Sequence, residues 1–239
     1  YYGYPTLAQL YLSSGYGLGV WNHVFDALFA LLAEMRSYQL RLPREEIDKA
    51  LASMYSDKTK ERLEKLCTFP LIQPFLESPF SINGTDFRPF QEYMAAIPAA
   101  CDKILCGSLD FLSVIHGDLC LSNVLCDPRS RIIKLVDPRG KFGEHTIYGD
   151  YRYELAKLAH SFNGAYELII NDLFMVLVDD HNIHCSSSVS AYEKAVGRMF
   201  NERLDKLYPA QREAVDLIEA LLFLSMIPLH GDYPNRQLM

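Results

Sequence analysis

The stretch His116-Gly-Asp-Leu-Cys-Leu-Ser-Asn-Val-Leu125 (HGDLCLSNVL) places a His, an Asp and an Asn within eight positions, between apolar residues. After it, Asp127-Pro-Arg-Ser130 is a turn signal, and the apolar run Ile132–Val136 ends at Asp137. Short apolar runs separated by turn residues predict strands with tight links. The polar side chains therefore fall in loops at strand ends, where a rigid scaffold usually carries chemistry.

Three of these side chains have the chemistry that phosphoryl transfer needs. If the two strands pair as a hairpin, Asp118, Asn123 and Asp137 converge. Carboxylate and carboxamide oxygens are hard ligands suited to Mg²⁺, and an acid that is not bound to the metal can accept a proton from a hydroxyl. A single Asp or Asn near a strand end is usually a turn or cap residue. The prediction therefore depends on the whole pattern H-G-D-x-x-x-x-N, strand, turn, strand, D.

The composition is that of an ordinary globular chain. It has 239 residues, of which 49% are hydrophobic and 22% charged, with a net charge of -7. No basic patch suggests a nucleic-acid partner. The longest apolar stretches, such as Ala220–Pro228, are too short to span a bilayer. The cysteines form no CxxC pair and no zinc spacing, so we expect reduced thiols in a cytoplasmic protein.

The pattern along the chain predicts an α+β fold that is mostly helical, with short hairpins in the middle. An Asn-Gly pair at 83–84 predicts a hairpin over Phe80–Phe87, and Asp179–Asn182 predicts another between Met175–Val178 and Ile183–Cys185. The expected strands of the central part are Phe111–Ile115, Asn123–Cys126 and Ile132–Val136. The expected helices are Leu7–Leu12, Val20–Leu40, one beginning at Pro43, Asp57–Leu66, Phe90–Leu105, Asp150–Phe162, Ser188–Leu207 and Gln211–Leu229.

The stretch VIHGDLCLSNVLCDPRSRIIKLVDPRG, Val114–Gly140, resembles the aminoglycoside phosphotransferase and choline kinase family, the small-molecule branch of the protein-kinase-like fold. Protein kinases carry His-Arg-Asp and Asp-Phe-Gly where this chain has His-Gly-Asp and Asp-Pro-Arg. The stretch YGDYRYELAK, Tyr148–Lys157, looks like the family's helix after the metal loop. These features look most similar to kinases of bacterial capsule and surface-polysaccharide pathways. The resemblance covers most of the chain and is strong over 113–160.

The resemblance implies roles for the motif residues. Asp118 would be the base, or the orienter, of the acceptor hydroxyl, and His116 would brace the loop by hydrogen bonding. Asn123 and Asp137 would hold Mg²⁺ between the phosphates of ATP.

Each of the remaining candidate residues has two possible roles. Leu125 and Val136 would form the apolar floor under adenine, or be plain core. Arg139 and Lys141 would neutralise phosphate or bind an anionic acceptor, or be solvated surface charges. Asp150 and Glu154 would line the acceptor pocket or anchor Arg152.

The same resemblance gives an expected domain organisation. Residues 1–6 would be the hinge that binds adenine, through Tyr2 and Tyr4. Residues 7–239 would be the C-terminal lobe, with the catalytic and metal loops in 113–141 and closing helices in 188–229. The N-terminal lobe, with its Gly-rich loop and strand Lys, would lie outside the chain, so we expect little or no kinase activity from the chain alone.

Two other functions remain open on the sequence. One is a non-catalytic kinase-like module that binds a partner or ligand. The other is a protein kinase, which the missing Ala-Pro-Glu anchor argues against. The acceptor, whether a sugar, an amino alcohol or an aminoglycoside, is also open. Asp150, Glu154, Asp179 and Asp180 would suit a cationic acceptor, whereas Arg139 and Lys141 would suit a sugar acid or phosphosugar.

Overall fold

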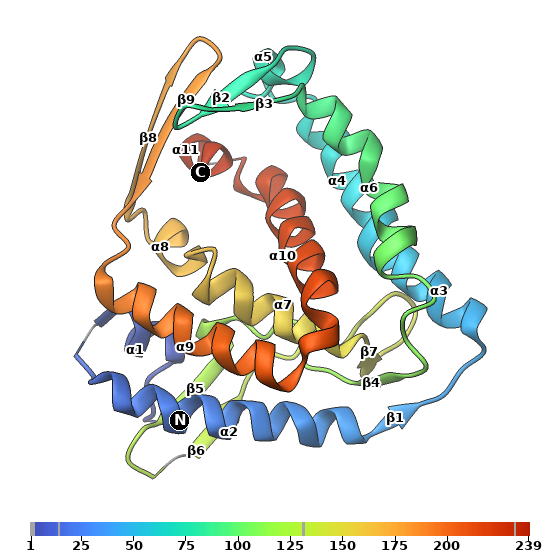
Figure 1. The fold of residues 1–239 in the computed structure, drawn as a ribbon, viewed down its shortest axis with the longest axis vertical. Helices are drawn as coiled ribbons and strands as arrows, with labels where there is room; N and C mark the ends of the chain where they lie inside the picture. Colours follow the sequence, from blue (N-terminus) through green and yellow to red (C-terminus); the bar gives the residue numbers. More distant parts are fainter. Residues whose placement is uncertain (1–2, 14, 131, 232) are drawn as a thin grey trace.

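The computed structural model describes residues 3–13, 15–130, 132–231 and 233–239, which form an α+β structure that is mostly helical (Figure 1). The α-helices are α1 Leu7–Ser13, α2 Leu18–Ser37, α3 Arg44–Ala52, α4 Lys58–Leu66, α5 Gln73–Leu76, α6 Phe90–Ile104, α7 Tyr151–Phe162, α8 Tyr166–Ile170, α9 Ala191–Leu207, α10 Arg212–Met226 and α11 Pro234–Leu238. The strands are β1 Gln39–Leu40, β2 Phe80–Ile82, β3 Thr85–Phe87, β4 Leu112–Val114, β5 Val124–Asp127, β6 Ile132–Leu135, β7 Tyr148–Gly149, β8 Phe174–Asp179 and β9 Asn182–Ser187.

Helix α7 is the central element of the fold, and every residue in it is buried. It begins at Asp150, whose side chain accepts a hydrogen bond from the Arg152 backbone N–H at 2.9 Å, as an N-cap residue should. Helices α10, α9 and α8 pack around it (Figure 1). An aromatic cluster closes its C-terminal end, where the Phe162 ring lies 5.7 Å from Trp21 and 5.2 Å from Phe25. This rigid helix positions the loops described below.

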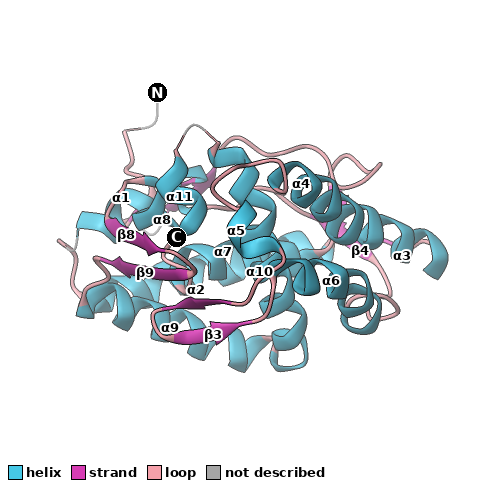
Figure 2. Cartoon of the chain, turned by 90° about the horizontal axis from the view of Figure 1, so that it is seen from above, coloured by secondary structure: helices cyan, strands magenta, loops and turns pink. Residues whose placement is uncertain are grey.

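Both predicted outer hairpins are confirmed, and they join into one sheet. The Asn83-Gly84 turn has φ of 50° and 79°, the left-handed values that a tight hairpin turn demands. Strand β2 then pairs in parallel with β9, with Ser81 opposite Asn182, to give the order β3-β2-β9-β8. Figure 2 shows β3, β8 and β9 of this sheet along one side of the helices. The parallel link was not predicted.

The central hairpin is also confirmed. Strands β5 and β6 pair antiparallel, with Val124 opposite Leu135 and Leu125 opposite Lys134. The segment before α1 lies against the hairpin's other edge, because Cys126 donates its backbone N–H to the Pro5 carbonyl at 2.9 Å and Thr6 bridges to Leu125. Strand β4 lies in a separate sheet of order β1-β4-β7.

Several predicted boundaries were wrong. The first long helix ends at Ser37 rather than Leu40, because Gln39–Leu40 pairs with β4 as strand β1. The last long helix ends at Met226, and 3-10 turns flank it at Pro209–Gln211 and Ile227–His230. The sequence did not predict β1 and β7, each of two residues, or the short helices α5, α8 and α11. Elements this short carry too little periodicity to be recognised.

Candidate active site

The His116-Gly117-Asp118 loop is held from below by helix α7. The Glu154 carboxylate accepts the backbone N–H of His116 at 3.1 Å and that of Gly117 at 2.9 Å. Glu154 is 1% exposed, and burial raises the pKa of its carboxyl to about 7 against the opposing effect of these two hydrogen bonds. Gly117 has φ of 80°, and a Cβ there would stand 3.0 Å from the Arg139 side chain, so glycine is required at this position.

The His116 side chain ties this loop to the loop that carries Asp137. Its Nδ1 accepts the Asp118 backbone N–H at 3.3 Å, so the neutral ring donates from Nε2 to the Val136 carbonyl at 2.9 Å. The His116 carbonyl also accepts the Arg139 backbone N–H at 2.9 Å. These hydrogen bonds hold the two loops together. This is the role that the resemblance implies for His116.

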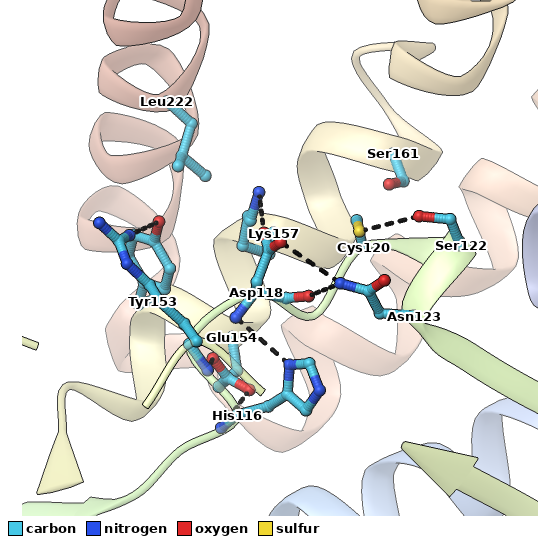
Figure 3. Close-up of polar contacts among 12 residues, drawn as sticks. His116, Asp118, Cys120, Ser122, Asn123, Tyr153, Glu154, Lys157, Ser161 and Leu222 are labelled. Carbon is cyan, nitrogen blue, oxygen red and sulfur yellow. Dashed lines mark hydrogen bonds and ion pairs between the residues drawn. The ribbon is translucent and has the colours of Figure 1, made fainter. Parts of the chain in front are cut away.

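The Asp118 carboxylate lies at the surface of this arrangement, with 42% of its side chain exposed. Lys157 of α7 places its Nζ 2.7 Å from Asp118 Oδ1. The Asn123 amide donates to the Asp118 carbonyl at 2.9 Å and to Oδ2 at 3.3 Å. Figure 3 shows the carboxylate between these two side chains. Although burial acts to lower it, the pKa of Lys157 is raised by Tyr153 and Asp118, so the ammonium stays charged.

Asn123 and Asp137 stand at the same end of the β5–β6 hairpin. The bond from the Val136 backbone N–H to the Asn123 carbonyl, at 3.0 Å, continues the strand pairing beyond Val124 and Leu135. Asp137 follows directly, exposed, with φ of 59°, a left-handed conformation that Asp tolerates better than most residues. The Asn123 amide nitrogen is engaged by Asp118, and Figure 3 shows the amide oxygen directed away from that contact.

Both side chains carry oxygens of the kind that Mg²⁺ prefers. A carboxylate and an amide oxygen at one strand end supply two hard ligands, and Mg²⁺ takes its remaining ligands from phosphate and water. Among the described residues, no group of three or more His, Cys, Asp or Glu could hold a metal ion. The predicted site would therefore depend on nucleotide phosphates to complete the coordination.

Positive charge surrounds Asp118. The side chain of Arg139 is exposed and donates to the Tyr153 hydroxyl at 3.2 Å, and Arg62 donates to the Ser225 carbonyl at 3.0 Å. Lys58, at the start of α4, has a pKa lowered to about 7 by burial and by the nearby charges of Arg139, Arg62 and Lys157, while Asp118 opposes this. This cluster of basic side chains, in which Lys58 is only partly protonated near neutral pH, outweighs the single carboxylate and favours an anion such as phosphate.

Sequence reasoning missed three members of this cluster, Lys58, Arg62 and Lys157. Lys58 and Arg62 lie on α4, a helix rich in charged residues and far from the motif in sequence. Lys157 was quoted in a motif without a role. A signal was present, because Glu154 and Lys157 interrupt a run of apolar residues at a spacing that puts them on one helix face.

The face of the hairpin opposite the core carries the residues predicted to contact adenine. Val124 and Cys126 point into the core, so Leu125 lies on the other face together with its partner Lys134. Val136 follows Lys134 by two residues and is likewise only partly buried. Tyr4 lies beside this face, with its ring 5.9 Å from the Lys134 ammonium. Tyr2 lies outside the described residues.

The prediction that Asp150 and Glu154 line an acceptor pocket was wrong. Asp150 is 0% exposed, pairs with Arg152 at 2.8 Å and accepts the Tyr55 hydroxyl at 3.1 Å. The other reading, an anchor for Arg152, holds for Asp150 but not for Glu154, whose oxygens bind the loop. Both point inward because α7 is buried on all sides. Lys141 is exposed.

The described helices include none that is both long and apolar enough to cross a membrane. Comparison with known proteins found no match to a protein family, a curated protein or a solved structure.

Proposed function

We propose that this chain carries the catalytic and metal-binding residues of an ATP-dependent phosphotransferase that phosphorylates a hydroxyl of a small molecule. The observation that supports this most strongly is the meeting of Asp118, Asn123 and the Asp137 loop at one end of the β5–β6 hairpin, inside a cluster of cations. The Asp118 carboxylate is exposed enough to meet a hydroxyl, whereas Glu154 and His116 hold its loop in place.

The residues divide the chemistry between them. Asp118 accepts the proton of the acceptor hydroxyl. The oxygen of that hydroxyl forms a bond to the γ-phosphorus of ATP, while the bond between this phosphorus and ADP breaks. Lys157 stabilises the carboxylate before that transfer. Asn123 and Asp137 would hold Mg²⁺, which neutralises phosphate charge. Lys58, Arg62 and Arg139 add positive charge where phosphoryl oxygens become more negative.

The proposal assigns the adenine to the face formed by Leu125, Val136 and Tyr4. ATP supply and the reduced cysteines fit a cytoplasmic enzyme. A small acceptor fits because the segment between Asp137 and helix α7 is too short for a long peptide-docking segment.

Phosphoryl transfer by the full-length protein tests this function. ADP release would be measured with Mg-ATP and a panel of sugars, amino alcohols and aminoglycosides. Asp118→Asn should lower turnover by about two orders of magnitude or more, since general-base catalysis contributes about that much, while the circular dichroism spectrum stays that of the folded protein.

Two results would count against the proposal. Unchanged turnover in Asp118→Asn would remove this residue from the reaction. Absence of transfer to every acceptor, together with binding of an acceptor that the substitution does not alter, would favour the non-catalytic binding module.

A further inference from the structure

A cavity lies between α10, α7, α8 and the β2–β9 pair. Its volume is about 280 Å³, and its wall is mostly apolar, with Phe75, Phe80, Tyr166 and Phe223 among the lining residues. An apolar cavity of about 150 Å³ is large enough for benzene. The cavity therefore has room for a six-membered ring with substituents.

One buried polar side chain on this wall has no partner. His160 is 0% exposed, and among the described residues neither of its ring nitrogens finds a hydrogen-bond partner. Its ring packs between Tyr166, with centroids 4.4 Å apart, and Phe223, at 4.0 Å. Burial holds the pKa of His160 well below its ordinary value, with a smaller contribution from Lys157, so the ring is neutral and offers one donor and one acceptor.

An unpartnered group of this kind needs an explanation. A buried donor or acceptor without a partner has lost its hydrogen bonds to water and gained none in return. Arg236, which also lines the cavity, is already bound by Asp172 through two bonds of 2.7 Å. His160 is thus a buried polar group able to orient an uncharged ligand in a mostly apolar space, which His230 and Gln237 also line.

Helix α7 connects the cavity to the site of the proposed reaction. His160 follows Lys157 by three residues on α7, which is about 4.5 Å along the helix axis, and Lys157 contacts Asp118. Tyr166, which lines the cavity, also lies within electrostatic reach of both residues: burial raises the pKa of its hydroxyl, the charge of Lys157 lowers it, and that of Asp118 raises it.

We propose that this cavity binds the ring of the acceptor, and that the acceptor is an uncharged cyclic alcohol oriented by a hydrogen bond to His160. This inference rests on the proposed function for the identity of the ligand as the acceptor. The apolar faces of the ring pack against Tyr166 and Phe223, one polar substituent meets the His160 ring, and the reacting hydroxyl reaches Asp118.

The first test measures binding without nucleotide, so that it does not depend on catalysis. Cyclohexanol, a six-membered ring with one hydroxyl, is titrated into full-length protein labelled with ¹⁵N at histidine. We expect saturable changes of the His160 ring nitrogen signals. His160→Phe, which keeps an aromatic ring between Tyr166 and Phe223, should weaken binding about tenfold, the loss of one hydrogen bond.

The controls separate this idea from the proposed function. His184→Phe, at an exposed position of β9, should leave cyclohexanol affinity unchanged. For an acceptor identified by the activity panel, His160→Phe should raise KM by a similar factor and leave kcat within about twofold. Equal cyclohexanol affinity in His160→Phe, or static His160 signals, would overturn the cavity proposal even if phosphoryl transfer is observed. Cyclohexanol binding that depends on His160, together with no transfer, would remove the acceptor assignment.

Discussion

Glu154→Gln provides the most informative single perturbation of the loop. The substitution keeps the size of the side chain but replaces one carboxylate oxygen with an N–H₂ group. The carboxylate now accepts the backbone N–H groups of His116 and Gly117 at 3.1 and 2.9 Å. In the variant one of these N–H groups would face the N–H₂ group of the glutamine, which is also a donor. Because both are buried, the unsatisfied donor should cost about 1–3 kcal/mol.

A second effect opposes this cost above neutral pH. Burial raises the pKa of Glu154 from 4.5 to about 7, so its ionisation in the folded protein is unfavourable. A shift of this size corresponds to about 3 kcal/mol, since one pKa unit is about 1.4 kcal/mol. Linkage gives the sign of the pH dependence. The stability that comes from a raised pKa is fully present below the pKa of Glu154 in the unfolded protein, and it is lost as pH rises through the pKa of Glu154 in the folded protein.

The two effects predict a pH-dependent difference in stability. At pH 5, where Glu154 is protonated, Glu154→Gln should lower the free energy of unfolding by about 1–3 kcal/mol. At pH 8 the variant escapes the ionisation cost, so the difference should shift in its favour by about 2–3 kcal/mol. Turnover should fall at both pH values, because the His116–Asp118 loop loses one of its two anchors.

Urea unfolding at pH 5 and pH 8, combined with hydrogen exchange of the His116 and Gly117 amides, measures both effects. Glu219→Gln is a matched control, because burial first and then Asp216 raise the pKa of Glu219 to about 7, and this residue lies on α10 away from the loop. It should reproduce the direction of the pH dependence without changing amide exchange or turnover. A difference in stability that is the same at both pH values, with unchanged exchange at both amides, would refute the reasoning.

Three further predictions concern charged side chains. Lys157→Met should lower turnover, measured as ADP release, at least tenfold. It should cost little stability, measured by unfolding, because a buried cation is replaced by an apolar side chain of similar size. Arg152→Met leaves Asp150 buried without its ion pair and should destabilise by about 3–5 kcal/mol, whereas Arg212→Met, at an exposed pair, should cost less than about 1 kcal/mol in the same urea titrations. Because the pKa of Lys58 is lowered to about 7 by burial and neighbouring cations, sulfate affinity measured by calorimetry should fall as pH rises above that value, and Lys58→Arg should flatten the profile.

Local signals predicted much of the fold. The Asn83-Gly84 turn, the strand–turn–strand pattern through Asp137 and the helix that begins after Asp150 each depend on residues near one another in sequence. The parallel pairing of β2 with β9 joins Ser81 to Asn182, and nothing in either strand specifies a partner so distant. The short strand β1 likewise forms only because β4 is available beside it.

Some residues of the candidate site could be predicted from local sequence, and others could not. Asp118, Asn123 and Asp137 could be named from their spacing, because the spacing itself brings them to one hairpin end. Glu154 was assigned wrongly because α7 is buried all round, and such a helix gives no amphipathic pattern to show which way a side chain points. Lys58 reaches the site only through tertiary packing. The sequence of a helix rich in charged residues does not indicate which of those residues will pack against a distant loop.

Metal binding at the hairpin end tests the central claim most directly. Binding of Mn²⁺ in the presence of ADP would be followed by electron paramagnetic resonance for the unaltered protein and for Asn123→Ala, Asp137→Ala and Asp127→Ala. Asp127 lies at the opposite end of the same hairpin, where its carboxylate accepts hydrogen bonds from Ser130 and Arg129, and is the matched control. The account predicts that Asn123→Ala and Asp137→Ala each weaken Mn²⁺–ADP binding at least tenfold while Asp127→Ala does not. Equal binding by all four proteins would contradict it.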